Sequence, residues 1–568
     1  MKGATALYQL LKGYGVKYLF GMDSPESLYK ELNRDDIRPI TVHDERSAAH
    51  MADGYARVTY RPGICTAIHG PGVTNLITGL AEAYVSCIPV IGLVSAVDLE
   101  LVGKHAIQEL DQVSLLKPVT KWVTRVETPD QVPEMLRKAF RIATTGKPGP
   151  VVLNLTYNAL KTEIRKETSV NLKAEPEFGS VPAIRIAAEP NRISKAANLL
   201  LKAQKPCIVA GGGVIQSQAW KELIELAETL AVPVATTMLG KGAIPDTHYL
   251  AVGVMGTYTS GTTGRGQVAN KIVAESDVVL FIGTQTDQVD TTNWTIPSHD
   301  STIIHIDIDP EEIGRNYSTT LGIVADAKLA LAQLVTIIKE RLPKQGKKAT
   351  RTKKIAQLVQ DWRDFIASES DSTTTPINPQ RLMKELQTFI DPKTIVVTDA
   401  SYSSLWVLSH IEFANPGRRF IGPRGLGIIG PGLPLALGAK LAAPKKPVIC
   451  ITGDGGFGYS YSDLETAARY EIPVTIIVLN NRMLGFQKHY EQTFYDKAIE
   501  CDFLDINFGQ LAETLKCSGQ RIETPDEITP ALRKAIKTNS PSVIDVVIDP
   551  DVPGPIAYFD SMREGKMK

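Results

Sequence analysis

The sequence predicts an α/β protein made of three doubly wound parallel-sheet domains. Short β-branched runs alternate with longer helical patterns along all 568 residues, as expected for parallel strands joined by crossover helices. The chain is too long for one hydrophobic core, so several domains are expected. The expected strands are residues 64–68, 90–94, 207–210, 278–282, 303–306, 395–398, 448–452 and 474–479.

Two polar stretches separate the three predicted domains. Residues 161–189 are rich in charge and contain Pro176 and Pro182, which is typical of a linker. In residues 342–376, a basic run (344–354) and a polar run (369–375) are expected to flank a short helix. The predicted domains are therefore residues 1–165, 189–343 (central) and 376–568.

Charge and composition exclude several classes of partner. Lys plus Arg and Asp plus Glu each total 62, so no net charge attracts nucleic acid or anionic lipid. The apolar run 88–97 is too short to span a bilayer and contains Pro89. The six scattered cysteines form no CxxC pattern, which favours reduced thiols. We therefore expect a cytoplasmic protein that binds small molecules, with no nucleic acid and no membrane as partner.

The most informative motif is Gly453-Asp454-Gly455-Gly456, directly after the apolar strand expected at 448–452. A second expected strand then ends at Asn480-Asn481, so the side chains of Asp454 and Asn481 should meet at one sheet edge. Carboxylate and amide oxygens suit Mg²⁺, and glycines let backbone N–H groups approach a diphosphate. For the glycine motif alone, the alternative is a strand-ending turn without a ligand.

This pairing resembles the diphosphate motif of thiamine-diphosphate enzymes, and nearly the whole chain resembles their acetolactate synthase branch. The resemblance extends to the central residues 211–213, 237–242 and 305–309. It implies that Mg²⁺ is held by Asp454, Asn481 and the main-chain oxygen of Met483. It also implies diphosphate contacts from Gly453, Gly455, Gly456, Ser401, Tyr402 and Ser403.

Residues 42–57 resemble the acidic motif of the same family, which places the catalytic acid at Glu45. The resemblance implies that Glu45 hydrogen-bonds the pyrimidine N1′ and promotes removal of the thiazolium C2 proton. It places Asn75 beside the pyrimidine, the Gly427 carbonyl as acceptor from N4′, and Ile429 beneath the two rings. The alternative for Glu45 is a capping or ion-pair role at a helix start.

Several positions differ from acetolactate synthases and bear on the substrate. Gln285 replaces an Arg thought to receive the carboxylate of the acceptor, and an amide lacks the charge-assisted fork of a guanidinium. Tyr490 replaces the Trp that selects the acceptor, and Ile107 replaces the Phe before Gln108. His69 replaces a small residue; it is either an acid, base or substrate donor, or a satisfied structural histidine.

The central domain carries a weaker signal for a nucleotide. Gly211-Gly212-Gly213 follows an expected strand, and Asp307 and Asp326 are candidates for ribose contacts. Acetolactate synthases hold FAD in this domain and their relatives that use coenzyme A hold ADP. A nucleotide fold that binds neither is the third alternative.

The resemblance implies a carboligase that decarboxylates a 2-oxo acid and transfers the acyl carbanion equivalent to a second carbonyl. Gln285 keeps open a lyase or decarboxylase acting on 2-hydroxyacyl or 2-oxoacyl compounds, coenzyme A thioesters included. A nicotinamide-dependent oxidoreductase would leave the Asp454 and Asn481 motifs unexplained, and Glu45 argues against a noncatalytic scaffold. In relatives the cofactor lies between two subunits, which implies a homodimer or homotetramer.

Overall fold

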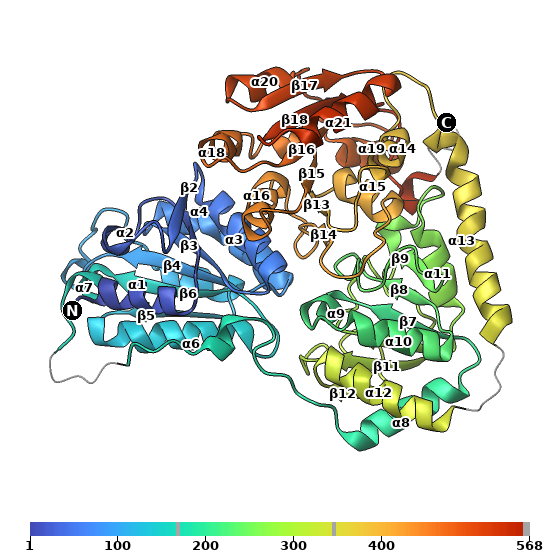
Figure 1. Ribbon diagram of the computed structural model, residues 1–568, viewed down its shortest axis with the longest axis horizontal. Helices are drawn as coiled ribbons and strands as arrows, with labels where there is room; N and C mark the ends of the chain where they lie inside the picture. Colours follow the sequence, from blue (N-terminus) through green and yellow to red (C-terminus); the bar gives the residue numbers. More distant parts are fainter. Residues whose placement is uncertain (166–170, 343–347, 561–568) are drawn as a thin grey trace.

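A computed structural model describes residues 1–165, 171–342 and 348–560 as three α/β lobes (Figure 1). Each lobe is built on a six-stranded sheet, so the predicted fold class is confirmed. Every strand expected from the sequence is present, with ends that differ by at most two residues. Within the described ranges, no helix is both long and apolar enough to cross a membrane.

The first lobe has the parallel strand order β2-β1-β3-β4-β6-β5. Helices α1 and α6 cover one face and α3 and α4 the other, so both faces of the sheet are buried. The strands are β1 (Tyr18–Gly21), β2 (Arg38–Thr41), β3 (Gly63–Ala67), β4 (Val90–Ala96), β5 (Trp122–Val126) and β6 (Val151–Thr156). The α-helices are α1 (Gly3–Gly13), α2 (Glu26–Glu31), α3 (Glu45–Thr59), α4 (Pro71–Val85), α5 (Gln112–Leu116), α6 (Val132–Thr144) and α7 (Tyr157–Lys161).

The third lobe repeats this topology with the order β14-β13-β15-β16-β18-β17. Numbered within each lobe, the two sheets are identical in order, which supports the duplication of an ancestral unit. The strands are β13 (Ile395–Thr398), β14 (Phe420–Ile421), β15 (Val448–Gly453), β16 (Thr475–Asn480), β17 (Ser518–Ile522) and β18 (Ser542–Val547). The α-helices are α14 (Pro379–Gln387), α15 (Tyr402–His410), α16 (Gly432–Ala442), α17 (Asp454–Phe457), α18 (Asp463–Arg469), α19 (Gly485–Tyr495), α20 (Phe508–Thr514) and α21 (Ile528–Lys537).

The second lobe has a different parallel order, β12-β11-β10-β7-β8-β9. This is the order of dinucleotide-binding folds, whose ligands lie where the order reverses, here between β7 and β10. The strands are β7 (Pro206–Ala210), β8 (Val234–Thr236), β9 (Ala251–Val254), β10 (Val278–Ile282), β11 (Thr302–Asp307) and β12 (Leu321–Val324). The α-helices are α8 (Pro190–Lys202), α9 (Gly212–Gln216), α10 (Trp220–Leu230), α11 (Gly266–Ala274) and α12 (Ala327–Arg341).

The second predicted linker is mostly a long helix, α13 (Lys348–Ser370), which runs along the second lobe (Figure 1). The prediction of a short helix is wrong because four apolar residues at helical spacing bury one stripe against that lobe. They are Ile355, Val359, Trp362 and Ile366. Residues 343–347 of the basic run and 166–170 of the first linker lie outside the described residues. The domain boundaries stay predictions.

The first and third lobes meet where α3 crosses α16. A Cβ at Gly54 or at Gly438 would overlap the backbone of the opposite helix, so the two helices are in backbone contact. Beside this crossing, buried Arg57 pairs with Asp53 and donates to the carbonyl of Gly422. The first lobe therefore holds the start of a loop in the third lobe that enters the site described next.

Candidate active site

The ends of β15 and β16 bring the predicted metal ligands together. These strands are parallel neighbours, so Asp454 after β15 and Asn481 after β16 lie at the same sheet edge. Both residues and Met483 line one cavity of about 640 Å³, here called the GDG cavity. Gly453, Gly455 and Gly456 line the same cavity.

The carboxylate of Asp454 is buried and only partly satisfied. Its Oδ1 accepts from the Gly455 backbone N–H at 2.9 Å, while its Oδ2 is buried without a hydrogen-bond partner among the described residues. Burial raises the pKa of this carboxyl to about 6, although backbone N–H groups, including those of Arg482 and Met483, oppose that rise. A buried carboxylate oxygen without a partner is costly, so the group fits a bound cation.

The two adjacent asparagines have different surroundings. The side-chain amide of Asn480 donates to Asp545 Oδ1 at 2.9 Å and to the Ile506 carbonyl at 3.1 Å. Asn480 therefore braces the sheet, whereas Asn481 lines the GDG cavity beside Asp454. This division agrees with the predicted assignment of the second asparagine, and not the first, to the metal.

The loop 425–432 forms another wall of the GDG cavity, with Gly427 and Ile429 among its lining residues. Gly427 has a φ of 76° and Gly430 a φ of 103°, values that favour glycine. The side chain of Ile429 is 39% exposed, so it is not a core residue of the single chain. An apolar side chain on an open cavity wall is free to support a ligand.

Asp399, which the sequence patterns do not single out, anchors this loop. It follows β13, is buried, and accepts from the backbone N–H groups of Gly430 at 2.9 Å and Gly432 at 3.0 Å. Its position directly after an expected strand is the only signal in the sequence, because the loop residues Gly430 and Gly432 lie more than thirty residues away.

Ser401, Tyr402 and Ser403 also line the GDG cavity, at the start of α15. The Ser403 hydroxyl donates to the Ala400 carbonyl at 2.6 Å, and the Tyr402 hydroxyl lies 2.7 Å from His489 Nδ1. These two hydroxyls are already engaged within the protein. Ser401, with a φ of 62°, is therefore better placed than its neighbours for a new side-chain contact.

Glu45 and Asn75 are brought together, but outside the GDG cavity of the single chain. Glu45 begins α3, is buried, and its Oε2 accepts from Asn75 Nδ2 at 3.0 Å. Asp44, not Glu45, caps α3, and Glu45 forms no ion pair with any described residue. Neither Glu45 nor Asn75 is among the residues that line the GDG cavity of the single chain.

Family models for three consecutive domains match the chain. They are the N-terminal TPP binding domain (residues 1–115), the central domain (193–334) and the C-terminal TPP binding domain (399–546) of the thiamine pyrophosphate enzymes. The chain belongs to the thiamine pyrophosphate enzyme family. Thiamine pyrophosphate is another name for thiamine diphosphate, so the predicted cofactor class is confirmed.

Curated relatives of the chain agree with the predicted branch of the family. A probable acetolactate synthase large subunit of Methanococcus aeolicus is 37% identical over 97% of this chain and 92% of its own length. Its counterpart in Methanocaldococcus jannaschii is 39% identical with the same coverage. The large subunit of acetolactate synthase isozyme 3 of Escherichia coli is 32% identical over 97% of this chain and 95% of its own length.

In this thiamine pyrophosphate enzyme, His69 and Gln108 line a separate cavity of the first lobe. His69 Nδ1 lies 3.1 Å from Ser95 Oγ and Nε2 lies 3.3 Å from the Ile107 carbonyl. Burial lowers the pKa of His69, which favours the neutral ring. Because each ring nitrogen of His69 has a partner within the protein, a structural role for His69 is better supported than a role as acid, base or substrate donor. The Ile107 residue is 83% exposed.

Two predicted substrate residues of this thiamine pyrophosphate enzyme do not line the GDG cavity. Gln285 lines a cavity between the first and second lobes instead, with Nε2 3.5 Å from the Val85 carbonyl. Val289 is the residue of the same loop that reaches the GDG cavity. Asp287 determines which residue of the loop reaches the cavity. Its carboxylate accepts from the Val289 and Asp290 backbone N–H groups at 2.8 Å and closes a turn.

Tyr490 also lies outside the GDG cavity, where α19 contributes Gly485, Phe486 and Gln487. The Tyr490 ring packs on Phe486 and Phe494, with centroids 6.2 Å and 4.6 Å away. Phe486 is one helical turn closer to the cavity on the same face of α19. Phe486, and not Tyr490, is therefore the aromatic residue that α19 contributes to the GDG cavity of the single chain.

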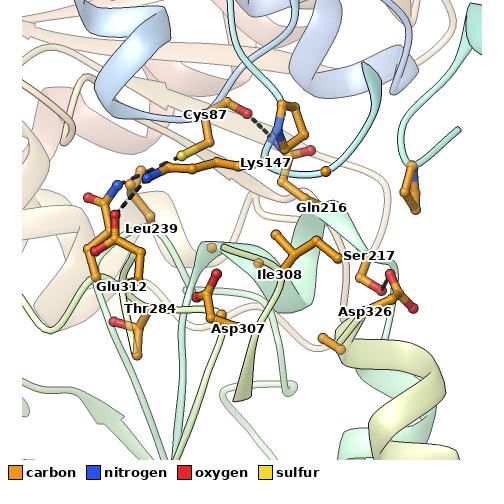
Figure 2. Close-up of a pocket in the computed structure, with 18 of the residues that line it drawn as sticks. Cys87, Lys147, Gln216, Ser217, Leu239, Thr284, Asp307, Ile308, Glu312 and Asp326 are labelled. Atoms are coloured by element: carbon orange, nitrogen blue, oxygen red, sulfur yellow. Dashed lines mark hydrogen bonds and ion pairs between the residues drawn. The ribbon is translucent and has the colours of Figure 1, made fainter. Parts of the chain in front are cut away.

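The cavity between the first and second lobes, here called the switch-point cavity, lies at the carboxyl ends of the second-lobe strands where their order reverses (Figure 2). Asp326 accepts from Arg185 Nη1 at 2.8 Å and from Ser217 Oγ at 2.7 Å. Burial raises the pKa of Asp307 to about 7. Lys147 of the first lobe reaches in and pairs with Glu312 at 2.6 Å (Figure 2).

Proposed function

We propose that the protein is a carboligase of acetolactate synthase type that depends on thiamine diphosphate and Mg²⁺. It would remove CO₂ from one 2-oxo acid and join the remaining acyl group to a second carbonyl compound. Similarity along nearly the full length of acetolactate synthase large subunits supports this reaction. The observation that carries the proposal is the buried Oδ2 of Asp454, which has no hydrogen-bond partner among the described residues and belongs to a residue that shares one cavity with Asn481 and Met483.

The proposed roles follow from the donor groups of each residue. Asp454, Asn481 and the Met483 carbonyl bind Mg²⁺ through oxygen atoms, and the glycines after β15 place N–H groups near the diphosphate. When bound, the cofactor supplies an electron sink for cleavage of the bond to CO₂. The Glu45 carboxyl would exchange a proton with the pyrimidine, and the Asn75 amide fixes the orientation of that carboxyl.

We further propose that two copies of the chain complete each site, in a homodimer or homotetramer. Glu45 and Asp454 do not share a cavity in one chain, yet both must contact one cofactor molecule. Leu426 and Ile429 on the cavity wall are 56% and 39% exposed, which leaves apolar surface for a partner or ligand to cover.

The purified protein with thiamine diphosphate, Mg²⁺ and pyruvate should release one CO₂ for each molecule of 2-hydroxy-3-oxo acid formed. This ratio is expected because one of the two 2-oxo acids loses its carboxylate and the other keeps it. Coupled CO₂ detection and chromatography of the products measure it. Aldehyde as the main product would instead support a decarboxylase, and turnover of 2-hydroxyacyl thioesters without CO₂ would support a lyase.

The switch-point cavity is proposed to bind a nucleotide, with FAD and ADP as the candidates. Its place between β7 and β10 and the two carboxylates, Asp307 and Asp326, support a ligand with ribose hydroxyls. Visible absorbance of the purified protein would identify FAD. Calorimetric titration with ADP addresses the other candidate.

Nucleotide affinity should rise with pH across neutrality. Burial raises the pKa of Asp307 to about 7. A ribose hydroxyl donates to the ionised carboxylate, so binding below that pH must displace a proton and weakens by up to about tenfold per pH unit. Calorimetry at several pH values measures the slope. Asp307→Asn should flatten the dependence of nucleotide affinity on pH, whereas Asp300→Asn, a control at an exposed position, should leave it unchanged. Equal slopes in all three proteins would contradict the role of Asp307 in binding the nucleotide.

A further inference from the structure

Arg424 is the only basic residue among the described residues that line the GDG cavity. Its guanidinium lies over the ring of Tyr258, 5.7 Å from the centroid, and its Nη1 is 3.5 Å from Ser404 Oγ. Arg424 precedes Gly425 and Gly427 in the loop that walls the cavity. A single positive charge therefore lies in the same cavity as the proposed Mg²⁺ ligands.

The charge of Arg424 has no close counterion. None of the described carboxylates forms an ion pair with it, and its Nε is buried without a hydrogen-bond partner in the described chain. By contrast, Arg57 pairs with Asp53, and Arg265 pairs with Glu412 at 2.7 Å. A guanidinium withdrawn from water is costly unless an anion accompanies it.

Neighbouring acids compensate for this charge only in part. Burial lowers the pKa of Arg424, while Asp290, Glu82 and Asp287 act in the opposite direction. Burial raises the pKa of Asp290 well above its ordinary value, which favours its neutral form. Glu82 is already engaged, because it accepts from the backbone N–H groups of Gly425 at 3.0 Å and Leu426 at 2.9 Å.

The same contacts hold Arg424 in place before any ligand arrives. Glu82 comes from α4 of the first lobe and grips the two residues that follow Arg424. The Arg424 backbone N–H donates to the Gly422 carbonyl at 2.9 Å, and Arg57 donates to that carbonyl at 3.3 Å. These contacts fix the backbone on both sides of Arg424, so the loop loses little conformational entropy when Arg424 binds an anion.

We propose that Arg424 binds the carboxylate of the acceptor 2-oxo acid, an inference that rests on the proposed carboligase function. Decarboxylation moves the negative charge of the donor carboxylate onto the substrate carbon and releases neutral CO₂, so a cation beside that carboxylate would stabilise the ground state and oppose the reaction. The acceptor keeps its carboxylate in the product, so its attraction to Arg424 has no such cost. Arg424 thus supplies, from the third lobe, the guanidinium fork that Gln285 cannot supply.

The test compares Arg424→Gln and Arg424→Lys with the wild type and with Arg533→Gln, a control at an exposed residue of α21. Calorimetry with oxamate, an unreactive analogue of pyruvate, measures anion binding without turnover. A competition between pyruvate and acetaldehyde as acceptors measures specificity through the ratio of hydroxy-oxo acid to acyloin. Calorimetry with thiamine diphosphate and Mg²⁺ reports whether the cofactor site is intact.

Arg424→Gln should weaken oxamate binding and raise the KM for the acceptor 2-oxo acid about 10- to 100-fold, shifting products towards acyloin. Arg424→Lys should recover part of this effect, and cofactor affinity should stay unchanged. Equal oxamate affinity in wild type and Arg424→Gln, or no binding by either, would overturn the inference. A main effect on cofactor affinity would also overturn it, by assigning Arg424 to the diphosphate. A wild type that releases no CO₂ from 2-oxo acids would instead reject the proposed function itself.

Discussion

Asp454→Asn should abolish binding of thiamine diphosphate in the presence of Mg²⁺. The substitution replaces a charged metal ligand in a buried position, and losing one member of a buried charge pair costs roughly 2–5 kcal/mol, or about 30- to several thousandfold in affinity. Calorimetry with cofactor and metal measures this loss directly. The control Asp526→Asn makes the same change at an exposed position of the same lobe and should bind normally.

The loss should not come from unfolding. Burial raises the folded-state pKa of Asp454 to about 6, so the stability that its proton provides is lost as the pH rises through that value. Asn carries no charge, and the variant without cofactor should be at least as stable as the wild type at pH 8. In a thermal melt, cofactor plus Mg²⁺ should raise the Tm of the wild type but not that of Asp454→Asn. An equal Tm rise in both proteins would remove Asp454 from the metal site.

Glu45→Gln should lower kcat by about 10²- to 10⁴-fold while leaving cofactor affinity nearly unchanged, because a carboxyl that transfers a proton contributes on that scale. The amide keeps the shape of the side chain, and its oxygen can still accept from Asn75. Steady-state kinetics and calorimetry separate the two effects. The exposed Glu26→Gln, in the same lobe, is the matched control and should behave as the wild type. Full activity of Glu45→Gln would show that this acid has no catalytic role.

The same two variants test whether the site is shared between chains. If Glu45 and Asp454 come from different copies, a mixed dimer of Glu45→Gln and Asp454→Asn has one site with both native residues. Mixing the inactive variants under conditions of subunit exchange should then restore up to about a quarter of wild-type activity, since half of the dimers are mixed and each has one intact site. Failure to restore activity after verified exchange would place both residues in a site within one chain.

Much of the fold follows from local patterns along the chain. The expected strands match those of the structure because a buried parallel strand needs a continuous β-branched run, whatever surrounds it. Helix α13 was underestimated because the charged residues of its exposed face resemble a linker. Its buried stripe, which includes Trp362 and Ile366, can be recognised only from its packing against the second lobe.

In the candidate site, too, some residues could be predicted from local patterns and others could not. Asp454 and Asn481 could be predicted because each directly follows a strand, and neighbouring parallel strands end at one edge. Gln285 and Tyr490 could not be placed from their motifs. Their positions depend on a turn closed by Asp287 and on which end of α19 faces the cavity.

The sequence by itself determined the three α/β units, the residue chemistry suited to Mg²⁺ and a diphosphate, and the family. These are properties of residue type and short spacing. Only the tertiary structure decided that Asp399 and Glu82 anchor the loop before the cavity, and that Arg424 is the one cation lining it among the described residues. It also decided that Glu45 and Asp454 line different places in one chain. The physical reason is that strand order and the packing of α3 on α16 set these distances, and residues far apart in sequence carry no local signal of them.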